Sequence, residues 1–444
     1  MQNNTQNDMK RTVGVLQGLS IVIGMIIGSG IFLKPTAVLR DAGSPKMAIL
    51  LWVVGGIISL CAALSVAEIG SNMPRAGGLY NYLEELYGEK WGFTLGWVQS
   101  IISYPAELAA QSIAIAIYAT YFVPMTAGTQ RMLALGMLFM LLVLNILSTK
   151  YGGAIQVAST FGKLVPFVAI ICMGLFKGHI PGAAGMSGEL IGESLAPGAA
   201  LLGTLWAYDG WLGVTNMAGE MKDPKKNLPR SIFLGVMSVI VVYVLFNLVI
   251  LRTLPADAIL TSETPAADAA EVLFGPGGAA FLTGGILISI FGSLNGHMMT
   301  GARVPQSMAA RGQLPCSRLI GKVNPKFGTP TNALIAQSLI AVFYIMSGTF
   351  HTLSNLATFV LWIFFTAGIV GVFLLRKRGL SDEKGYRIPL YPITPVLGAL
   401  GSSYILLSTL FGNPSQSIFA IVVALLGLPL FSILKKRNSA NNGQ

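Results

Sequence analysis

Long apolar runs are the feature that most constrains how this chain folds, because about 20 consecutive apolar residues is the length of a helix that crosses a bilayer. Only 11% of the 444 residues are charged, whereas soluble globular proteins carry about 25%. The sequence therefore predicts an all-α polytopic membrane protein with twelve transmembrane helices. The predicted spans are residues 13–39, 46–72, 92–123, 132–148, 154–177, 197–219, 230–252, 278–310, 331–347, 354–375, 393–411 and 416–434.

Lysine and arginine indicate the orientation of these spans, because cytoplasmic loops carry an excess of both. With the N-terminus inside, 21 of the 29 Lys and Arg residues fall in inside segments and 5 in outside segments; Lys34, Lys163 and Arg303 lie within spans. We therefore expect a multi-pass protein of the plasma membrane with two cytoplasmic tails, residues 1–12 and 435–444. The net charge of +11 follows from this bias, so the predicted partner is the lipid bilayer and not nucleic acid.

Gly28, Ser29 and Gly30 interrupt the first apolar run at mid-depth. Each glycine weakens a helix by roughly 1 kcal/mol relative to alanine. An opened helix inside hydrocarbon strands backbone N–H and C=O groups unless they line a cavity or meet a polar ligand. The N–H groups at the start of the second half-helix would then form an anion site. The alternative is a small-residue face that lets another helix pack closely.

A second interruption, Tyr208-Asp209-Gly210, lies in span 6, about 180 residues and five spans after the first. A unit of five spans that repeats must be inverted in the membrane, because five is odd. Interrupted spans at matching places in two halves are typical of a transporter substrate site. The pair of interruptions therefore favours the functional interpretation over the packing one.

Five motifs resemble the amino acid–polyamine–organocation superfamily, and most closely its L-amino-acid transporter branch with the bacterial serine/threonine and alanine/serine/cysteine exchangers. The motifs are Ile-Ile-Gly-Ser-Gly-Ile-Phe at 26–32, Ala-Glu-Ile-Gly at 67–70, Pro-Arg-Ala-Gly-Gly-Leu-Tyr at 74–80, Ala-Tyr-Asp-Gly-Trp at 207–211 and Phe-Gly-Ser-Leu-Asn-Gly at 291–296. The resemblance implies a leucine-transporter-type fold with broken helices 1 and 6. Residues 13–177 and 195–375 would be inverted repeats of five spans, followed by two further spans in 391–434.

An amino acid carries a carboxylate and an ammonium, and the two interruptions offer main-chain groups for both. The implied substrate contacts are the N–H groups of Ser29, Gly30 and Ile31, the Ser29 hydroxyl, and the carbonyls of Ile26, Trp206 and Asp209. The Asp209 carboxylate is an alternative ligand for the ammonium or a proton carrier. Trp206 stands where many relatives have a phenylalanine that closes over the substrate, so its larger indole predicts a smaller pocket; the alternative is a core tryptophan.

Lys163 lies about ten residues into span 5. A charged side chain there costs at least ~2.5–3.5 kcal/mol, which makes a function the default expectation; the alternative is snorkelling to the inner face. The resemblance places this amine where sodium-coupled relatives hold sodium, between span 1 carbonyls near Met25 and a span 8 hydroxyl, for which Ser289 is the candidate. Tyr243 matches a family tyrosine near this lysine, or is a core aromatic.

Other polar features are less specific. Glu68, Glu220 and Arg303 form an inner gate in one interpretation and are surface charges in the other. Glu107, in the middle of span 3, has no explanation from the motifs. A short amphipathic helix at the inner interface is predicted for 77–87, and an external helix for 261–274.

The sequence thus predicts a sodium-independent exchanger of small neutral L-amino acids: Ala, Ser, Cys and Thr. The alternatives are a proton-coupled symporter, a cationic amino-acid or polyamine antiporter, and a non-transporting amino-acid sensor. No P-loop, Cys/His cluster or nucleophile–base set is present, so neither an enzyme nor a cofactor or metal is predicted. By the resemblance, animal relatives bond to a glycoprotein subunit through a cysteine between spans 3 and 4. Residues 124–131 contain no cysteine, so no covalent partner of that kind is expected.

Overall fold

The computed structural model describes residues 14–73, 78–147, 149–177, 180–185, 195–216, 218, 221–382 and 385–442. In these ranges every regular element is a helix, and eight are long and apolar enough to cross a membrane, counting α5 to α6 and α13 to α14 as one each. These eight contain α3 (Pro45–Asn72), α5 (Glu89–Val98) with η1 (Gln99–Ser103) and α6 (Tyr104–Ala119), α7 (Ala127–Leu147), α11 (Pro224–Thr253), α13 (Pro265–Gly301) with α14 (Arg303–Ala310), α17 (Phe350–Lys377), α18 (Ile393–Gly412) and α19 (Pro414–Asn442).

A ninth candidate span in the described ranges is broken. It consists of α1 (Val15–Ile26) and α2 (Gly30–Ala42), which meet at an angle of 50°. Further helices lie where spans 5, 6 and 9 are predicted. They are α8 (Thr149–Lys177), the short pair α9 (Pro197–Ala207) and α10 (Leu212–Asn216), and α16 (Thr331–Ser347). The all-helical, polytopic architecture is therefore confirmed, while the count of twelve spans and the inverted repeat stay predictions.

Three short helices complete the described chain: α4 (Leu79–Tyr87), α12 (Ala256–Thr261) and α15 (Ser317–Ile320). The helix predicted for 77–87 is present as α4, but Asn81, which we expect on its polar face, is buried together with the apolar residues. The helix predicted for 261–274 is present as the first turns of α13, which bends at Gly275, where φ is +76°.

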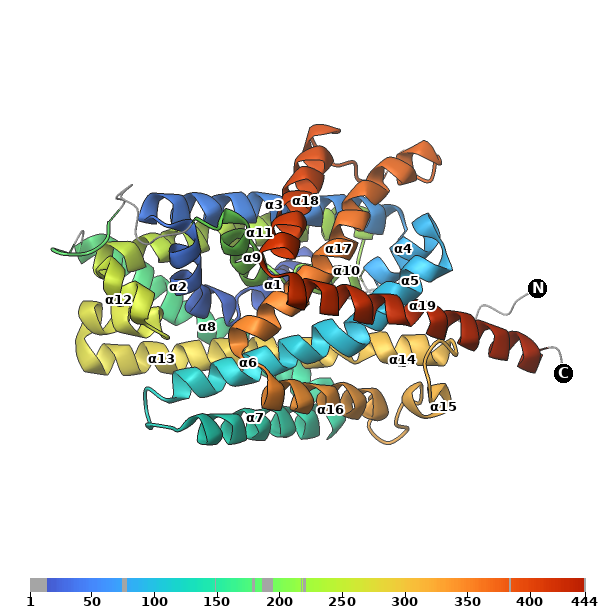
Figure 1. Ribbon diagram of the computed structural model, residues 1–444, viewed down its shortest axis with the longest axis horizontal. Coiled ribbons are helices and arrows are strands. Elements are labelled where there is room, and N and C mark those ends of the chain that lie inside the picture. Colours follow the sequence, from blue (N-terminus) through green and yellow to red (C-terminus); the bar gives the residue numbers. More distant parts are fainter. Residues whose placement is uncertain are drawn as a thin grey trace.

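Helices α3, α6, α7, α13 and α19 lie roughly along the long axis of the molecule, whereas α18 crosses it and α17 is inclined to it (Figure 1). Helices α4, α14 and α15 lie at one end and α12 at the other. Helix α13 packs along α6 and α8, and α3 packs along α11. The broken span lies between these groups, since α1 contacts α11 and α2 contacts α9. Large apolar side chains face outwards, for example Phe176, 89% exposed, and Phe411, 80% exposed. Such a surface is suited to lipid and not to water.

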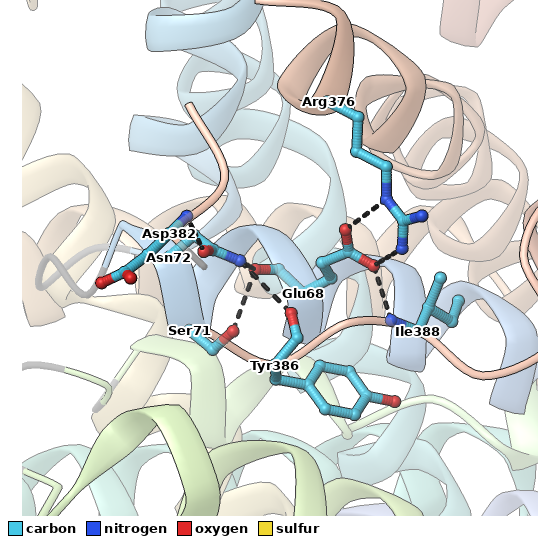
Figure 2. A network of polar contacts seen from close by, with 7 residues as sticks. All are labelled: Glu68, Ser71, Asn72, Arg376, Asp382, Tyr386 and Ile388. Carbon is cyan, nitrogen blue, oxygen red and sulfur yellow. Dashed lines mark hydrogen bonds and ion pairs between the residues drawn. The ribbon is translucent and has the colours of Figure 1, made fainter. Parts of the chain in front are cut away.

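A polar network ties the end of α3 to the segment after α17 (Figure 2). The buried Glu68 carboxylate accepts from Arg376 Nε at 2.8 Å and Nη2 at 2.9 Å, and from the Ile388 N–H at 2.6 Å. One turn further, the Asn72 side chain accepts from the Asp382 N–H at 2.8 Å. The inner-gate hypothesis is therefore wrong about the arginine that pairs with Glu68: it is Arg376 and not Arg303.

Of the other two residues of that hypothesis, Arg303 is exposed and Glu220 lies outside the described residues. The ion pair that forms instead is bidentate and almost fully enclosed on the carboxylate side, which is the strongest geometry for an arginine and a carboxylate. It fastens α17 to α3.

Candidate functional site

The first break is an opened helix between α1 and α2. Helix α1 ends at Ile26, and Ile27 is extended, with φ −73° and ψ 91°. Helix α2 starts at Gly30, so the amides of Ser29, Gly30 and Ile31 have no helical carbonyl one turn before them. All three residues are buried. The break thus presents free N–H groups inside the protein, which is the arrangement that binds a carboxylate.

The second break is a tight turn between α9 and α10. It requires glycine, because Gly210 has φ +119°, a conformation that L-residues rarely adopt. Asp209 turns its carboxylate back to accept from the Gly210 N–H at 2.8 Å. The Trp206 carbonyl, predicted to meet a substrate ammonium, already accepts from the Asp209 N–H at 3.2 Å. It keeps a second lone pair for another donor.

The two breaks pack against each other. A Cβ atom on Gly30 would lie 2.5 Å from the Ala207 Cα, and one on Gly210 would lie 2.8 Å from the Ile26 nitrogen. The Tyr243 hydroxyl lies 2.9 Å from the Ile26 carbonyl and 3.0 Å from the Ala207 carbonyl. The glycines therefore open the helices and also allow close packing, while the anion site at the opened amides stays a prediction.

Lys163 is fully buried in α8 and holds the end of α1. Its Nζ donates to the Gly24 carbonyl at 2.6 Å and to the Ile27 carbonyl at 2.7 Å. Ser289 of α13 donates to the same Ile27 carbonyl at 3.3 Å. The lysine and the serine thus share one acceptor, and the two carbonyls that the lysine contacts lie near Met25, as in the predicted bridge.

A small cavity of about 20 Å³ lies between the breaks on one side and two unbroken helices on the other. This is room for about one water molecule. Its lining residues are Met25, Ile26, Gly28, Ser29, Gly30, Trp206 and Asp209 from the breaks, and Glu107, Gln111, Ser293 and His297 from α6 and α13. The structure therefore brings together Ile26, Ser29, Gly30, Trp206 and Asp209. Ile31 follows in the first turn of α2, while Lys163, Tyr243 and Ser289 support the breaks from behind.

The polar residues of α6 and α13 are the part of the site that sequence reasoning missed. Glu107 Oε2 and Gln111 Oε1 are buried, and neither has a hydrogen-bond partner among the described residues. His297 Nε2 lies 3.4 Å from Glu107 Oε2. An ionisable residue in the middle of a span is a sign of function, and Gln111 lies one helical turn further on the same face. The mid-span Glu107 and the Gln111 one turn later are thus the sequence features that could have indicated this part of the site.

A larger cavity of about 560 Å³ opens on the side of α12 and is separated from the small one by aromatic rings. Trp206 lines the small cavity and Phe350 the large one. Their rings meet edge to face with centroids 6.1 Å apart. Beside them the buried Lys34 donates from α2 to Ser354 Oγ at 2.7 Å and Asn355 Oδ1 at 3.0 Å on α17. These contacts close the small cavity on that side.

At the opposite end, Arg311 joins α14 to α4. It donates to Asn81 Oδ1 at 2.9 Å, Glu84 Oε2 at 3.1 Å and Tyr80 Oη at 3.2 Å. Burial raises the pKa of the Tyr80 phenol, so the hydroxyl keeps its proton and donates to Gln313. These polar contacts join α14 to α4 at the end of the molecule opposite α12.

Comparison with known proteins identifies the chain. Residues 13–429 match the Amino acid permease family. The chain belongs to this family. The permease is 40% identical to the serine/threonine exchanger SteT of Bacillus subtilis over 98% of this chain and 99% of that protein. It is 30% identical to the human cystine/glutamate transporter, over 95% of this chain and 85% of that protein. It is also 30% identical to the mouse Asc-type amino acid transporter 1, over 95% and 81%.

The family membership predicted from the five motifs is therefore confirmed. These relatives are transporters and exchangers by name, which places this permease among amino-acid exchangers and not among enzymes. Together with the apolar helices, the match also makes it a multi-pass membrane protein.

Proposed function

We propose that this permease is a sodium-independent exchanger of small neutral L-amino acids, Ala, Ser, Cys and Thr, working by alternating access. The observation that carries the proposal is the small cavity between two paired helix breaks. Free N–H groups at the start of α2 suit a carboxylate, and carbonyls at the ends of α1 and α9 suit an ammonium. The name of the serine/threonine exchanger SteT supports exchange of small amino acids.

In this proposal the main chain recognises what all α-amino acids share. The N–H groups of Ser29, Gly30 and Ile31 and the Ser29 hydroxyl bind the carboxylate. The carbonyls of Ile26, Trp206 and Asp209 accept from the ammonium. The Trp206 indole limits the size of the side chain, since it lines the small cavity and its ring packs on Phe350.

Sodium independence rests on Lys163. Its ammonium fills the space between the Gly24 and Ile27 carbonyls, where a cation would otherwise be needed to satisfy both oxygens. We therefore expect that exchange needs no sodium gradient. Tyr243 and Ser289 assist by holding the Ile26 and Ile27 carbonyls.

The same proposal covers the whole chain. Twelve spans, with inverted repeats in 13–177 and 195–375 and two further spans in 391–434, would place the breaks at mid-membrane. Both tails would be cytoplasmic in a plasma-membrane protein, as the Lys and Arg distribution indicates. The two broken spans would tilt against the unbroken helices and open the small cavity to each side in turn. No covalently attached subunit is expected.

Uptake of labelled serine into vesicles that contain the purified permease tests this function. We expect uptake when the vesicles are preloaded with Ala, Ser, Cys or Thr, little uptake into empty vesicles, and no change when sodium replaces potassium. Persistent stimulation by sodium would overturn the role of Lys163. Uptake into empty vesicles driven by a proton gradient would favour symport, and effective competition by arginine or spermidine would favour a cationic substrate. Serine binding without any flux would indicate a sensor.

A further inference from the structure

The polar residues of α6 and α13 have no part in the main-chain recognition proposed above, yet they line the same small cavity. Glu107 and Gln111 lie one turn apart on α6, and His297 lies opposite them on α13. Each has at most 6% of its surface exposed. Two buried polar atoms, Glu107 Oε2 and Gln111 Oε1, have no hydrogen-bond partner among the described residues. An unpaired buried polar group is unfavourable, so a ligand in the cavity that bonded to both atoms would be stabilised.

The contacts of His297 fix which atom donates. Its Nδ1 lies 2.9 Å from the Ser293 carbonyl, and a carbonyl can only accept, so Nδ1 carries a hydrogen. The same Nδ1 lies 3.1 Å from the side-chain amide of Gln111, which must then present its oxygen to the ring. The amide oxygen and nitrogen are exchangeable assignments. The Gln111 NH₂ group therefore turns to the cavity as a donor.

The same tautomer leaves a lone pair on His297 Nε2, which lies 3.4 Å from Glu107 Oε2. No hydrogen bond joins these two atoms, so Glu107 Oε2 stays unpaired within the described part of the chain. The cavity wall opposite the breaks thus offers one donor, the Gln111 amide, and one acceptor, the Glu107 carboxyl group.

A bound amino acid whose charged groups lie at the breaks turns its side chain to the opposite wall, which α6 and α13 form. Ser293 also belongs to this wall, but its hydroxyl donates to the Met25 carbonyl at 3.4 Å. A hydroxyl both accepts and donates a hydrogen bond, so it pairs with Gln111 and Glu107 together. A methyl group does neither and leaves both buried groups unpaired. Asp209, which also lines the cavity, accepts from the Gly210 N–H through Oδ1, and its carboxyl group shares a hydrogen bond with the Glu107 carboxyl group.

We propose that Glu107, Gln111 and His297 form the side-chain subsite of this permease and select amino acids whose side chain carries a hydroxyl, serine and threonine, over apolar side chains of equal size. The inference rests on the proposed function, because it assumes that the charged groups of the amino acid lie at the breaks. Glu107 and Gln111 touch the substrate, while His297 positions them.

The test compares substrates of equal shape. Labelled serine exchange is measured in vesicles that contain the full-length permease, with serine against 2-aminobutyrate and threonine against valine as competitors. In each pair a hydroxyl replaces a methyl group. We expect the hydroxyl member to compete at least about tenfold better, because a site built to bond a hydroxyl rejects an analogue that lacks it. Equal potency within each pair would overturn the inference.

Variants assign the preference to its residues. Gln111→Leu is expected to bring both ratios close to one. Gln337→Leu is the matched control: Gln337 is buried on α16 and donates to the Met298 carbonyl at 3.0 Å, but it does not line the cavity. The control is expected to keep both ratios. An equal change in both variants would overturn the assignment.

Glu107 separates side-chain recognition from ammonium binding. Glu107→Gln keeps an acceptor oxygen and is expected to retain a preference for hydroxyls, whereas Glu107→Leu is expected to lose it. If Glu107 bound the ammonium instead, both variants would lose serine and 2-aminobutyrate equally, and the inference would be wrong. For a variant that transports poorly, the ratio is read from the thermal shift that each amino acid gives in the purified protein. Failure of the wild-type permease to exchange any of these amino acids would refute the proposed function itself.

Discussion

At the scale of single residues, buried hydrogen-bonding groups do most of the work at this site. Lys163 and Tyr243 both donate to carbonyls that α1 frees at its end. An unpaired buried carbonyl costs roughly 1–3 kcal/mol. The break in α1 is therefore stabilised by side chains from α8, α11 and α13, which complete its bonding.

Tyr243→Phe tests this contribution with the smallest change. The ring still packs against Trp52 and Tyr208, whose centroids lie 5.8 and 5.1 Å away. Only the hydroxyl between the Ile26 and Ala207 carbonyls is lost, so we expect the free energy of unfolding to fall by about 1–2 kcal/mol. Serine exchange should slow on the order of tenfold, measured in preloaded vesicles.

The matched control is Tyr344→Phe. Its hydroxyl donates to the Ile101 carbonyl at 3.1 Å, away from the breaks. We expect this variant to lose a similar amount of stability and to exchange serine at nearly the wild-type rate. Equal slowing in both variants would show that Tyr243 has no special place in transport.

Lys163→Met tests whether the lysine amine stabilises the break in the same way. The Gly24 and Ile27 carbonyls lose their charged donor, and we expect both a lower melting temperature and a loss of exchange beyond tenfold. Addition of sodium that restores melting temperature would support the view that the amine stands in for a cation. Lys177→Met is the control, since Lys177 donates to the Leu273 carbonyl far from the breaks; sodium should not change its behaviour.

At the scale of elements, the site depends on close contact between the two breaks. Gly30 of α2 meets Ala207 of α9, and Gly210 meets Ile26 of α1. Gly30→Ala places a Cβ atom 2.5 Å from the Ala207 Cα, a backbone contact that cannot move aside easily. We expect α2 and α9 to separate, with exchange lost by more than about tenfold and a destabilisation of roughly 1–3 kcal/mol, as for overpacking in a core.

Gly136→Ala provides the comparison. Gly136 lies within α7, and a Cβ atom there meets nothing within 4 Å. Because alanine favours a helix by about 1 kcal/mol relative to glycine, this variant should be as stable as the wild type or more so, with normal exchange. Thermal unfolding followed by intrinsic tryptophan fluorescence checks both variants.

The helices and the breaks also show which parts of the structure could be predicted from the sequence. Apolar runs predict long helices, because every backbone group in lipid must be bonded within its own helix. The breaks were predictable from glycines at mid-depth. The cavity wall was not: Glu107 and Gln111 on α6 meet His297 of α13 only through packing, and they are almost 190 residues from it in sequence. Helix α4 shows the same limit, since its amphipathic pattern does not reveal that other helices bury its polar residue Asn81.

At the scale of the whole molecule, the Glu68–Arg376 pair holds distant segments together (Figure 2). Arg376 also stacks on the Tyr391 ring, 3.7 Å from its centroid. Arg376→Gln leaves a buried carboxylate without its cation. We expect a loss of about 3–5 kcal/mol in unfolding free energy, read as a large drop in melting temperature.

An exposed ion pair nearby is the control for that change. Lys225 and Asp382 pair with 38% and 44% of their side chains exposed, and such pairs contribute about 0–1 kcal/mol. Lys225→Gln should therefore leave the melting temperature almost unchanged. A similar drop in melting temperature in both variants would mean that burial does not set the contribution of the Glu68–Arg376 pair to stability.

The Tyr243 hydroxyl has one hydrogen and two neighbouring oxygens, one from each interrupted helix. It can point to either, so a tilt that draws one helix end away leaves the bond to the other intact. The enthalpy lost at the outset of such a movement is therefore small, and the two ends need not break free together. The Tyr243 hydroxyl can therefore stay hydrogen-bonded to one broken helix while the other moves away.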